Sequence, residues 1–176
     1  MKRSLFLQTL SFFVLAAFFS LSSCAQNPPA SPPAKASGKI GAANVTIDYS
    51  SPSVKGRQIF GGLVPYDKVW RAGANTATSL ETDKDLMVEG KKLPAGKYSL
   101  FATPGEKEWT IILNSETGQW GIKRGGEANR DPAKDVLTVK ATPRKSASMN
   151  ERLAYLVNPD GIVLQWENVE VPVAIK

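Results

Sequence analysis

The sequence has 176 residues, with 22 lysines and arginines against 16 aspartates and glutamates, and a single cysteine. It contains no histidine, which excludes histidine-ligated metal sites and the Ser-His-Asp and Cys-His forms of catalysis. The basic excess is mild and no run of five basic residues occurs, so nucleic-acid binding is not expected. We also expect no cofactor and no bound metal, and any catalysis would have to use Asp, Glu, Lys, Tyr, Ser or Thr.

The first 23 residues have the order of a secretory signal. A basic pair precedes an apolar run over residues 5–21, and two serines and then Cys24 follow. The strongly apolar part is short for a membrane span, which favours a cleaved signal over an uncleaved anchor. We therefore expect residues 1–23 to be removed.

Cys24 stands where this signal ends, and the stretch Leu21-Ser22-Ser23-Cys24 resembles a bacterial lipobox. As the only cysteine it has no internal disulfide partner, and the resemblance implies a lipidated thiol and a firm membrane anchor. The alternative is a chance cysteine at a signal-peptidase boundary. No acidic stretch follows Cys24, so we expect an exported lipoprotein on the periplasmic face of the outer membrane.

Residues 24–38 are rich in proline, alanine and serine and show no apolar periodicity. This composition predicts a semi-rigid tether. The folded part is then expected over residues 39–176, which is enough for one domain with a core and too little for two.

The folded part shows the period-two alternation of half-buried strands rather than helical periodicity. The one short helical candidate, residues 60–70, is weakened by its glycines and Pro65. About nine short strands with regular turn signals predict an all-β fold, an antiparallel β-sandwich or jelly roll. The clearest strands are expected at residues 44–50, 77–83, 85–90, 97–104, 108–115, 135–142 and 151–158, with two more in 158–175.

Two hairpins are expected from the turn signals between these strands. Residues 97–104 and 108–115 flank a Pro-Gly turn, and 135–142 and 151–158 form a second candidate pair. Trp109 lies on an apolar strand face, as does Trp166, so both indoles are expected in the core.

Several motifs carry a resemblance to a known family. PSVKGR at 52–57, GGLVPY at 61–66, VWRAGAN at 69–75 and LPAGKYSLF at 93–101 closely resemble DUF2911. The resemblance covers nearly all of the folded part and implies a compact β fold and an envelope location, without a reaction. The family usually continues after Trp-Gly with a tyrosine-bearing segment and an aspartate-led strand; this sequence keeps Asp135 and lacks the tyrosine.

The motif VWRAGAN allows two interpretations. In the structural one, Trp70 anchors the segment, Gly73 takes a positive φ, and Arg71 donates to carbonyls or to a carboxylate such as Asp67. In the functional one, Arg71 forms an anion-binding fork with other side chains around it. The candidate ligand-binding residues are Arg57, Lys68, Arg71, Asn75 and Trp120.

The acidic residues suggest less. Glu81, Asp83 and Asp85 alternate in one segment, which is more typical of a solvated turn than of a calcium site. A carboxylate pair could cleave a glycosidic bond, but nothing in the sequence brings two acids together. The candidates are Asp48, Asp67, Asp135 and Glu167.

Three hypotheses follow. The first is a lipid-anchored, non-catalytic β-sandwich that binds a small anionic or carbohydrate ligand or an envelope protein. The second is a carboxylate-based hydrolase acting on envelope glycan or ester bonds. The third is a purely structural or assembly lipoprotein, which would show an exposed apolar patch or an unpaired strand edge.

Overall fold

A computed structural model of the protein describes residues 29–176, and most of this part consists of antiparallel β-strands. The predicted signal peptide, Cys24 and the beginning of the predicted tether lie outside the described residues. No helix within residues 29–176 is long and apolar enough to cross a lipid bilayer. The strands are β1 (Pro33–Ile40), β2 (Ala43–Ser50), β3 (Thr78–Thr82), β4 (Leu86–Val88), β5 (Lys91–Leu93), β6 (Gly96–Thr103), β7 (Trp109–Asn114), β8 (Asp135–Ala141), β9 (Arg144–Asn158) and β10 (Gly161–Ala174).

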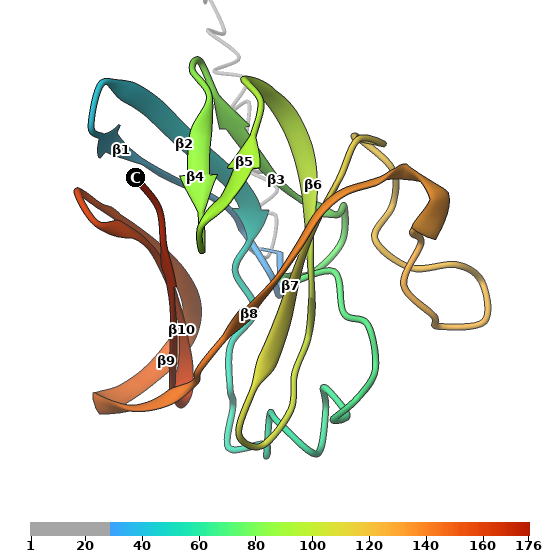
Figure 1. The fold of residues 1–176 in the computed structure, drawn as a ribbon. Coiled ribbons are helices and arrows are strands. Elements are labelled where there is room, and N and C mark those ends of the chain that lie inside the picture. The colour runs from blue at the N-terminus through green and yellow to red at the C-terminus, as the bar shows by residue number, and fades with distance from the viewer. Residues whose placement is uncertain (1–28) are drawn as a thin grey trace, which may run out of the picture.

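Six of these strands form one sheet in the order β1-β2-β3-β6-β7-β8, and every neighbouring pair is antiparallel. The long strands β9 and β10 form a separate two-stranded ribbon, and β4 and β5 form a small hairpin. In Figure 1 the orange-to-red ribbon of β9 and β10 curves across one side of the main sheet. The expected all-β, antiparallel sandwich-like fold is confirmed.

The main core lies between the sheet and the β9–β10 ribbon. Alternate residues of the strands point into it, because successive side chains of a strand lie on opposite faces. Trp109 and Trp166 are each 1% exposed there, as predicted. A smaller apolar cluster of Ala77, Phe101 and Ile112 lies apart from this core and is covered by Val69 and Ala128. Strands β6 and β7 are consequently buried on both faces.

The hairpin of β6 and β7 forms as predicted, with Thr103 opposite Thr110 next to the turn. The predicted pairing of residues 135–142 with 151–158 is wrong. Strand β8 pairs with β7 at the sheet edge, while β9 pairs with β10 across the Asn158–Gly161 turn. The turn signals marked the strand ends correctly, but the chain changes sheets between β8 and β9.

Two further expectations about the strands are corrected. Two strands were expected within residues 158–175, but this part of the chain contains the single long strand β10, with irregularities on both sides of Glu167, which has φ of 55°. Residues 60–70 form turns and isolated bridges instead of a helix. Phe60 bridges to Val64 and Trp70 to Ala102, and the glycines allow the chain to turn where a helix would have to continue.

The predicted tether boundary at residue 38 also lies too far along the chain. Strand β1 begins at Pro33 and pairs with β2 over its whole length. Its small residues hid it, since they give almost no hydrophobic alternation. The small size has a packing reason at Gly38, where an added Cβ would lie 2.9 Å from the carbonyl oxygen of Val157 in β9.

Candidate functional site

A cavity of about 880 Å³ lies beside the long segment that connects β2 to β3. Residues of that segment that fall within 52–57 and 63–74 form much of its wall, although not every residue of these ranges lines it. Further lining residues come from the segment between β7 and β8, within residues 122–132, from Trp166 of β10, and from Ala30 and Ser31 before β1. Its volume falls within the usual range for small-ligand sites.

Positive side chains dominate the charged part of this lining. Six basic residues face one carboxylate, Glu127. One of the six, Arg130, is already paired with Asp135 at 3.4 Å. The others give the cavity a net positive field, which attracts anions. The six are Lys55, Arg57, Lys68, Arg71, Lys123 and Arg130.

Arg71 is the most unusual of these cations because it is partly buried. Its Nε is inaccessible to solvent and has no hydrogen-bond partner among the described residues. Burial lowers the pKa of the Arg71 guanidinium from its ordinary value, yet arginine remains charged at neutral pH. No ion pair with Asp67 or another acid of residues 29–176 compensates this charge. A partly buried charge without an acidic partner is unfavourable, which favours an anion beside Arg71.

Two indoles form an aromatic part of the wall. Trp70 and Trp166 stack with their ring centroids 5.9 Å apart and an interplanar angle of 17°. The Trp70 Nε1 donates to the carbonyl of Gly73 at 3.1 Å. The Nε1 of Trp166 is buried and, like the Nε of Arg71, lacks a partner within the described part of the chain. The cavity lining thus includes two residues with unused buried donors.

The backbone around Arg71 is held in an uncommon conformation. Ala72 has φ of 51° and Asn75 has φ of 58°, a region that residues with a side chain rarely adopt. The carbonyl of Ala72 accepts hydrogen bonds from the Tyr155 hydroxyl at 2.7 Å and from the Thr78 hydroxyl at 2.9 Å. A strained backbone conformation persists only where the surrounding contacts hold it in place, and such conformations cluster at functional sites.

The positive φ expected at Gly73 occurs instead at its neighbours. Gly73 is needed for space, because an added Cβ would lie 2.6 Å from the Thr78 Oγ1 and 3.3 Å from the Ser50 carbonyl oxygen. Glycine here permits close approach of two segments rather than an unusual dihedral angle.

The structure brings three of the five predicted ligand-binding residues to one cavity, namely Arg57, Lys68 and Arg71. Lys68 is exposed at the wall. Arg57 has a second role, since its guanidinium donates to the carbonyls of Val54 at 3.0 Å and Ser53 at 2.5 Å.

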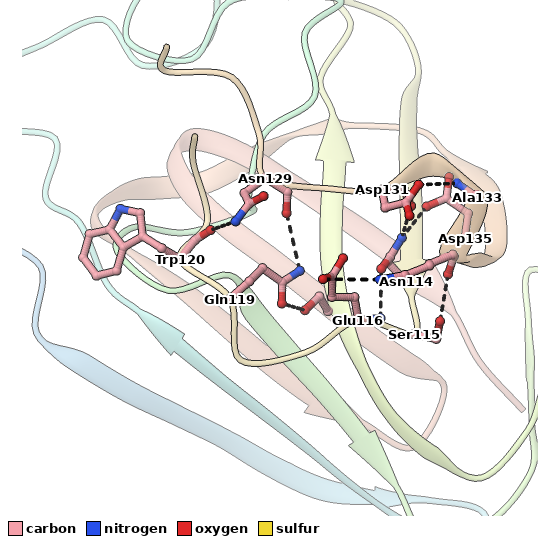
Figure 2. A network of polar contacts seen from close by, with 11 residues as sticks. Asn114, Ser115, Glu116, Gln119, Trp120, Asn129, Asp131, Ala133 and Asp135 are labelled. Atoms are coloured by element: carbon pink, nitrogen blue, oxygen red, sulfur yellow. Dashed lines mark hydrogen bonds and ion pairs between the residues drawn. The ribbon is translucent and has the colours of Figure 1, made fainter. Parts of the chain in front are cut away.

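The other two predicted residues do not line the cavity. Asn75 donates through Nδ2 to the Ser31 carbonyl at 3.2 Å and the Ser50 hydroxyl at 3.3 Å, so it fixes the chain entry. Trp120 is 56% exposed, and Figure 2 shows its indole pointing away from the polar network beside it.

That network holds the loop between β7 and β8 in place (Figure 2). Asn114 is fully buried and donates to the Asp131 carbonyl at 2.8 Å and to the Asp135 carboxylate at 2.9 Å. The Asn114 side-chain oxygen accepts from the backbone N–H of Glu116 at 3.0 Å. A buried polar group with this many partners rigidifies its surroundings, so the loop presents Lys123 and Arg130 to the cavity.

Sequence reasoning missed several lining residues. Trp166 and Trp70 were expected only as core anchors, and Lys123 and Arg130 belong to a glycine-bearing charged loop that lacks a phosphate-binding motif. The one feature of the sequence that could have indicated these residues is the high density of charged residues in that loop. The position of the loop beside Arg71, however, depends on long-range packing, which local sequence patterns do not encode.

The acidic candidates do not form a pair in this cavity, which Glu127 alone lines among the acids of the described chain. Asp48 pairs with Lys35 at 3.2 Å, and Asp135 with Arg130. Asp67 and Glu167 do not belong to the lining. The hydrolase hypothesis therefore gains no support from the cavity.

The acids of residues 81–85 have separate partners. Asp83 accepts from the backbone and side-chain nitrogens of Asn44, Asp85 pairs with Lys92 at 2.8 Å, and Glu81 with Lys97 at 3.6 Å. No group of three metal-ligating side chains occurs within residues 29–176.

Comparison with known proteins gives one family and no individual relative. No curated protein and no solved structure matches the chain significantly. The model of a family described as "Protein of unknown function (DUF2911)" matches residues 31–175. This match includes β1 and continues to the end of β10, and therefore covers the cavity and the whole β fold. The chain belongs to the DUF2911 family.

Proposed function

We propose that the protein binds a small anionic ligand in the cavity beside Arg71, as a non-catalytic, lipid-anchored protein of the bacterial envelope. The observation that carries the proposal is the buried Nε of Arg71, which has no partner among residues 29–176 and belongs to a lining with six cations and one acid. A carboxylate or phosphate would supply the missing acceptor and offset the buried charge.

The positions of strained residues support the same site. Lys55 lines the cavity at φ of 48°, Ala72 and Asn75 flank the lining residues 73 and 74, and Glu167 follows Trp166. Unfavourable backbone conformations that gather around one concavity favour a functional site over loop packing alone.

The proposed location rests on the leader sequence and on Cys24. Export and lipidation would hold the domain at the outer membrane, facing the periplasm, with the ligand taken from that compartment. Mass spectrometry of the membrane fraction tests this part of the proposal. A mature N-terminus at a diacylated Cys24 is expected, and an unmodified thiol or a different N-terminus would contradict it.

Binding can be tested with a matched pair of fluorescent probes, anilinonaphthalene sulfonate and the uncharged phenylnaphthylamine. The protein is the chain from residue 24 with Cys24→Ser, which corresponds to the expected mature form without lipid. We expect the sulfonate to bind more tightly than the neutral probe, and its binding to weaken with salt. Equal binding of both probes would contradict an anion site.

Two substitutions connect this binding to the cavity. Arg71→Gln should weaken sulfonate binding by roughly tenfold or more, because a hydrogen bond to a charged group contributes about 1.5–3 kcal/mol. Lys68→Gln should weaken it severalfold, and the matched control Lys145→Gln, at an exposed lysine of β9 outside the lining, should leave it unchanged. Near-UV circular dichroism and the melting temperature show whether each variant is folded. If Arg71→Gln only unfolds the protein while Lys68→Gln binds normally, the arginine is structural.

A further inference from the structure

The cavity wall also has a large apolar part beside its basic residues. Leu63, Val64, Val69 and Ile122 line it together with the indoles of Trp70 and Trp166. Leu63 is 49% exposed, so a large aliphatic side chain is left partly in water at the site. A hydrophilic anion would leave this surface wet, whereas covering apolar surface is favourable by about 25 cal/mol per Å².

The hydrogen-bond donors without partners indicate what polar group the ligand carries. The Nε of Arg71 and the Nε1 of Trp166 donate hydrogen bonds and cannot accept them, and both are buried without a partner in the described chain. They call for a group with acceptor oxygens. At about 880 Å³, the cavity also has room for far more than a bare carboxylate or phosphate, so the acceptor group must belong to a larger, apolar body.

The chain enters the fold at the edge of this cavity. Ser31 lines it, the Ser31 carbonyl accepts from Asn75, and the Pro32 carbonyl accepts from the backbone N–H of Ser51 at 2.8 Å. Six residues lie between Cys24 and Ser31, and the seven Cα–Cα steps that connect the two positions span at most about 25 Å. With a lipid on Cys24, the cavity would therefore stay close to the membrane surface.

We infer that the ligand is an amphiphilic anion with a single acyl chain, such as a fatty acid or a lysophospholipid. The acyl chain would cover the aliphatic and aromatic wall, and the carboxylate or phosphate would accept from the guanidinium of Arg71. This inference rests on the proposed anion site and names the class of ligand that the site takes. The membrane that holds the lipid anchor is the nearby source of such molecules.

The test is displacement of anilinonaphthalene sulfonate from the same Cys24→Ser chain by butanoate, octanoate and dodecanoate, below their micellar concentrations. The inhibition constant should fall by up to about fourfold for each added CH₂ group until the wall is covered. Dodecanol, which has the chain without the charge, should displace at least tenfold less well than dodecanoate. Inorganic phosphate, which has the charge without the chain, should displace weakest.

These outcomes separate the two proposals. Equal displacement by butanoate and dodecanoate would overturn the acyl-chain inference and leave the anion site standing. Equal displacement by dodecanol and dodecanoate would instead overturn the anion site. A comparison of dodecanoate with lysophosphatidylglycerol distinguishes the two sources of ligand. Tighter binding of dodecanoate would identify a free fatty acid, and tighter binding of lysophosphatidylglycerol would identify a membrane lipid.

Leu63→Asn provides the site-specific arm. It should flatten the dependence on chain length and weaken dodecanoate at least threefold, with little effect on butanoate. The matched control is Leu156→Asn, at a leucine of β9 that is 42% exposed and outside the cavity lining. An equal loss in both variants, or in neither, would contradict the placement of the acyl chain.

Discussion

Gly121 packs directly against the side chain of Arg71. A Cβ at Gly121 would lie 2.8 Å from the Cβ of Arg71 and 2.9 Å from the Asn75 carbonyl oxygen, and closer still to the Cδ of Arg71. The backbone N–H of Gly121 donates to the same Asn75 carbonyl at 2.9 Å. The glycine at position 121 therefore has a physical reason, because any larger residue would displace the arginine.

Gly121→Ala should accordingly destabilise the protein by about 1–3 kcal/mol, the usual cost of overpacking, and weaken anion binding. Gly125→Ala is the matched control for stability, since a Cβ there meets nothing within 4 Å. Urea denaturation of both variants and probe titration of Gly121→Ala check this prediction. A Gly121→Ala variant with unchanged stability and binding would show that the arginine does not depend on this contact.

Tyr155→Phe should remove the hydrogen bond that connects the β9–β10 ribbon to the backbone beside Arg71. The Tyr155 hydroxyl donates to the buried carbonyl of Ala72, so its loss should cost about 1 kcal/mol, measured by urea denaturation. Phenylalanine keeps the ring that packs edge-on against Tyr49 at 4.9 Å. A loss below a few tenths of a kcal/mol would show that Thr78 alone holds the carbonyl.

Tyr155 should also make the folding stability depend on pH in the alkaline range. Burial raises the pKa of Tyr155 well above the ordinary value of 10.0, so the unfolded chain loses this proton at a lower pH than the folded one. The stability contributed is complete below about pH 10 and falls as the pH rises further. Denaturation between pH 8 and about pH 11 should show a smaller loss in Tyr155→Phe than in the parent. Equal losses would contradict the assignment to Tyr155.

Asp83 should make the folding stability depend on pH in the acid range, with stability lost as the pH falls rather than as it rises. Hydrogen bonds from the backbone and side chain of Asn44 lower the pKa of this carboxyl from its ordinary value of 3.8. Its contribution is therefore present above about pH 4 and is lost as the pH falls through the depressed value. Asp83→Asn should reduce the loss of stability between pH 5 and about pH 2, measured by thermal denaturation. Asp160→Asn, in the turn between β9 and β10, is the control and should behave like the parent.

Asn114→Ala should loosen the loop between β7 and β8. The substitution removes the hydrogen bonds to the Asp131 carbonyl and to the partly buried Asp135 carboxylate, at a cost of about 1–3 kcal/mol. Hydrogen exchange should increase through residues 115–134. The control Ser115→Ala removes one exposed hydrogen bond from the same loop, at 3.2 Å, and should have little effect. Unchanged exchange in Asn114→Ala would place the control of the loop elsewhere.

The sequence predicted the strands better than their partners. Alternation identified residues 44–50 and 108–115 because each strand has one strongly apolar face. It could not show that β8 joins β7 while β9 leaves the sheet, since pairing is decided by long-range packing. Strand β1 was hidden for a different reason, because the close approach of Gly38 to β9 selects small residues that resemble a linker.

The basic residues of the site could be predicted from the sequence, whereas the aromatic residues of the cavity wall could not. Arg57 and Arg71 lie in family motifs, Lys68 lies between two of these motifs, and the cavity brings all three residues together. Trp166 lies nearly one hundred residues away from Arg71, on a strand whose alternation indicated only a core position. Asn75 was predicted to bind ligand, but its side chain donates to the Ser31 carbonyl, which belongs to a segment that was expected to be a tether.

The stacked indoles of Trp70 and Trp166 have a practical consequence for spectroscopy. Two indoles fixed with their centroids 5.9 Å apart should couple their transitions and contribute to the near-ultraviolet dichroism, to which the solvent-facing Trp120 adds little. A molecule seated against the pair would perturb that signal directly. Occupancy of the cavity could therefore be followed in unlabelled protein, and extracts of the native envelope could be screened optically before any candidate molecule has been chosen.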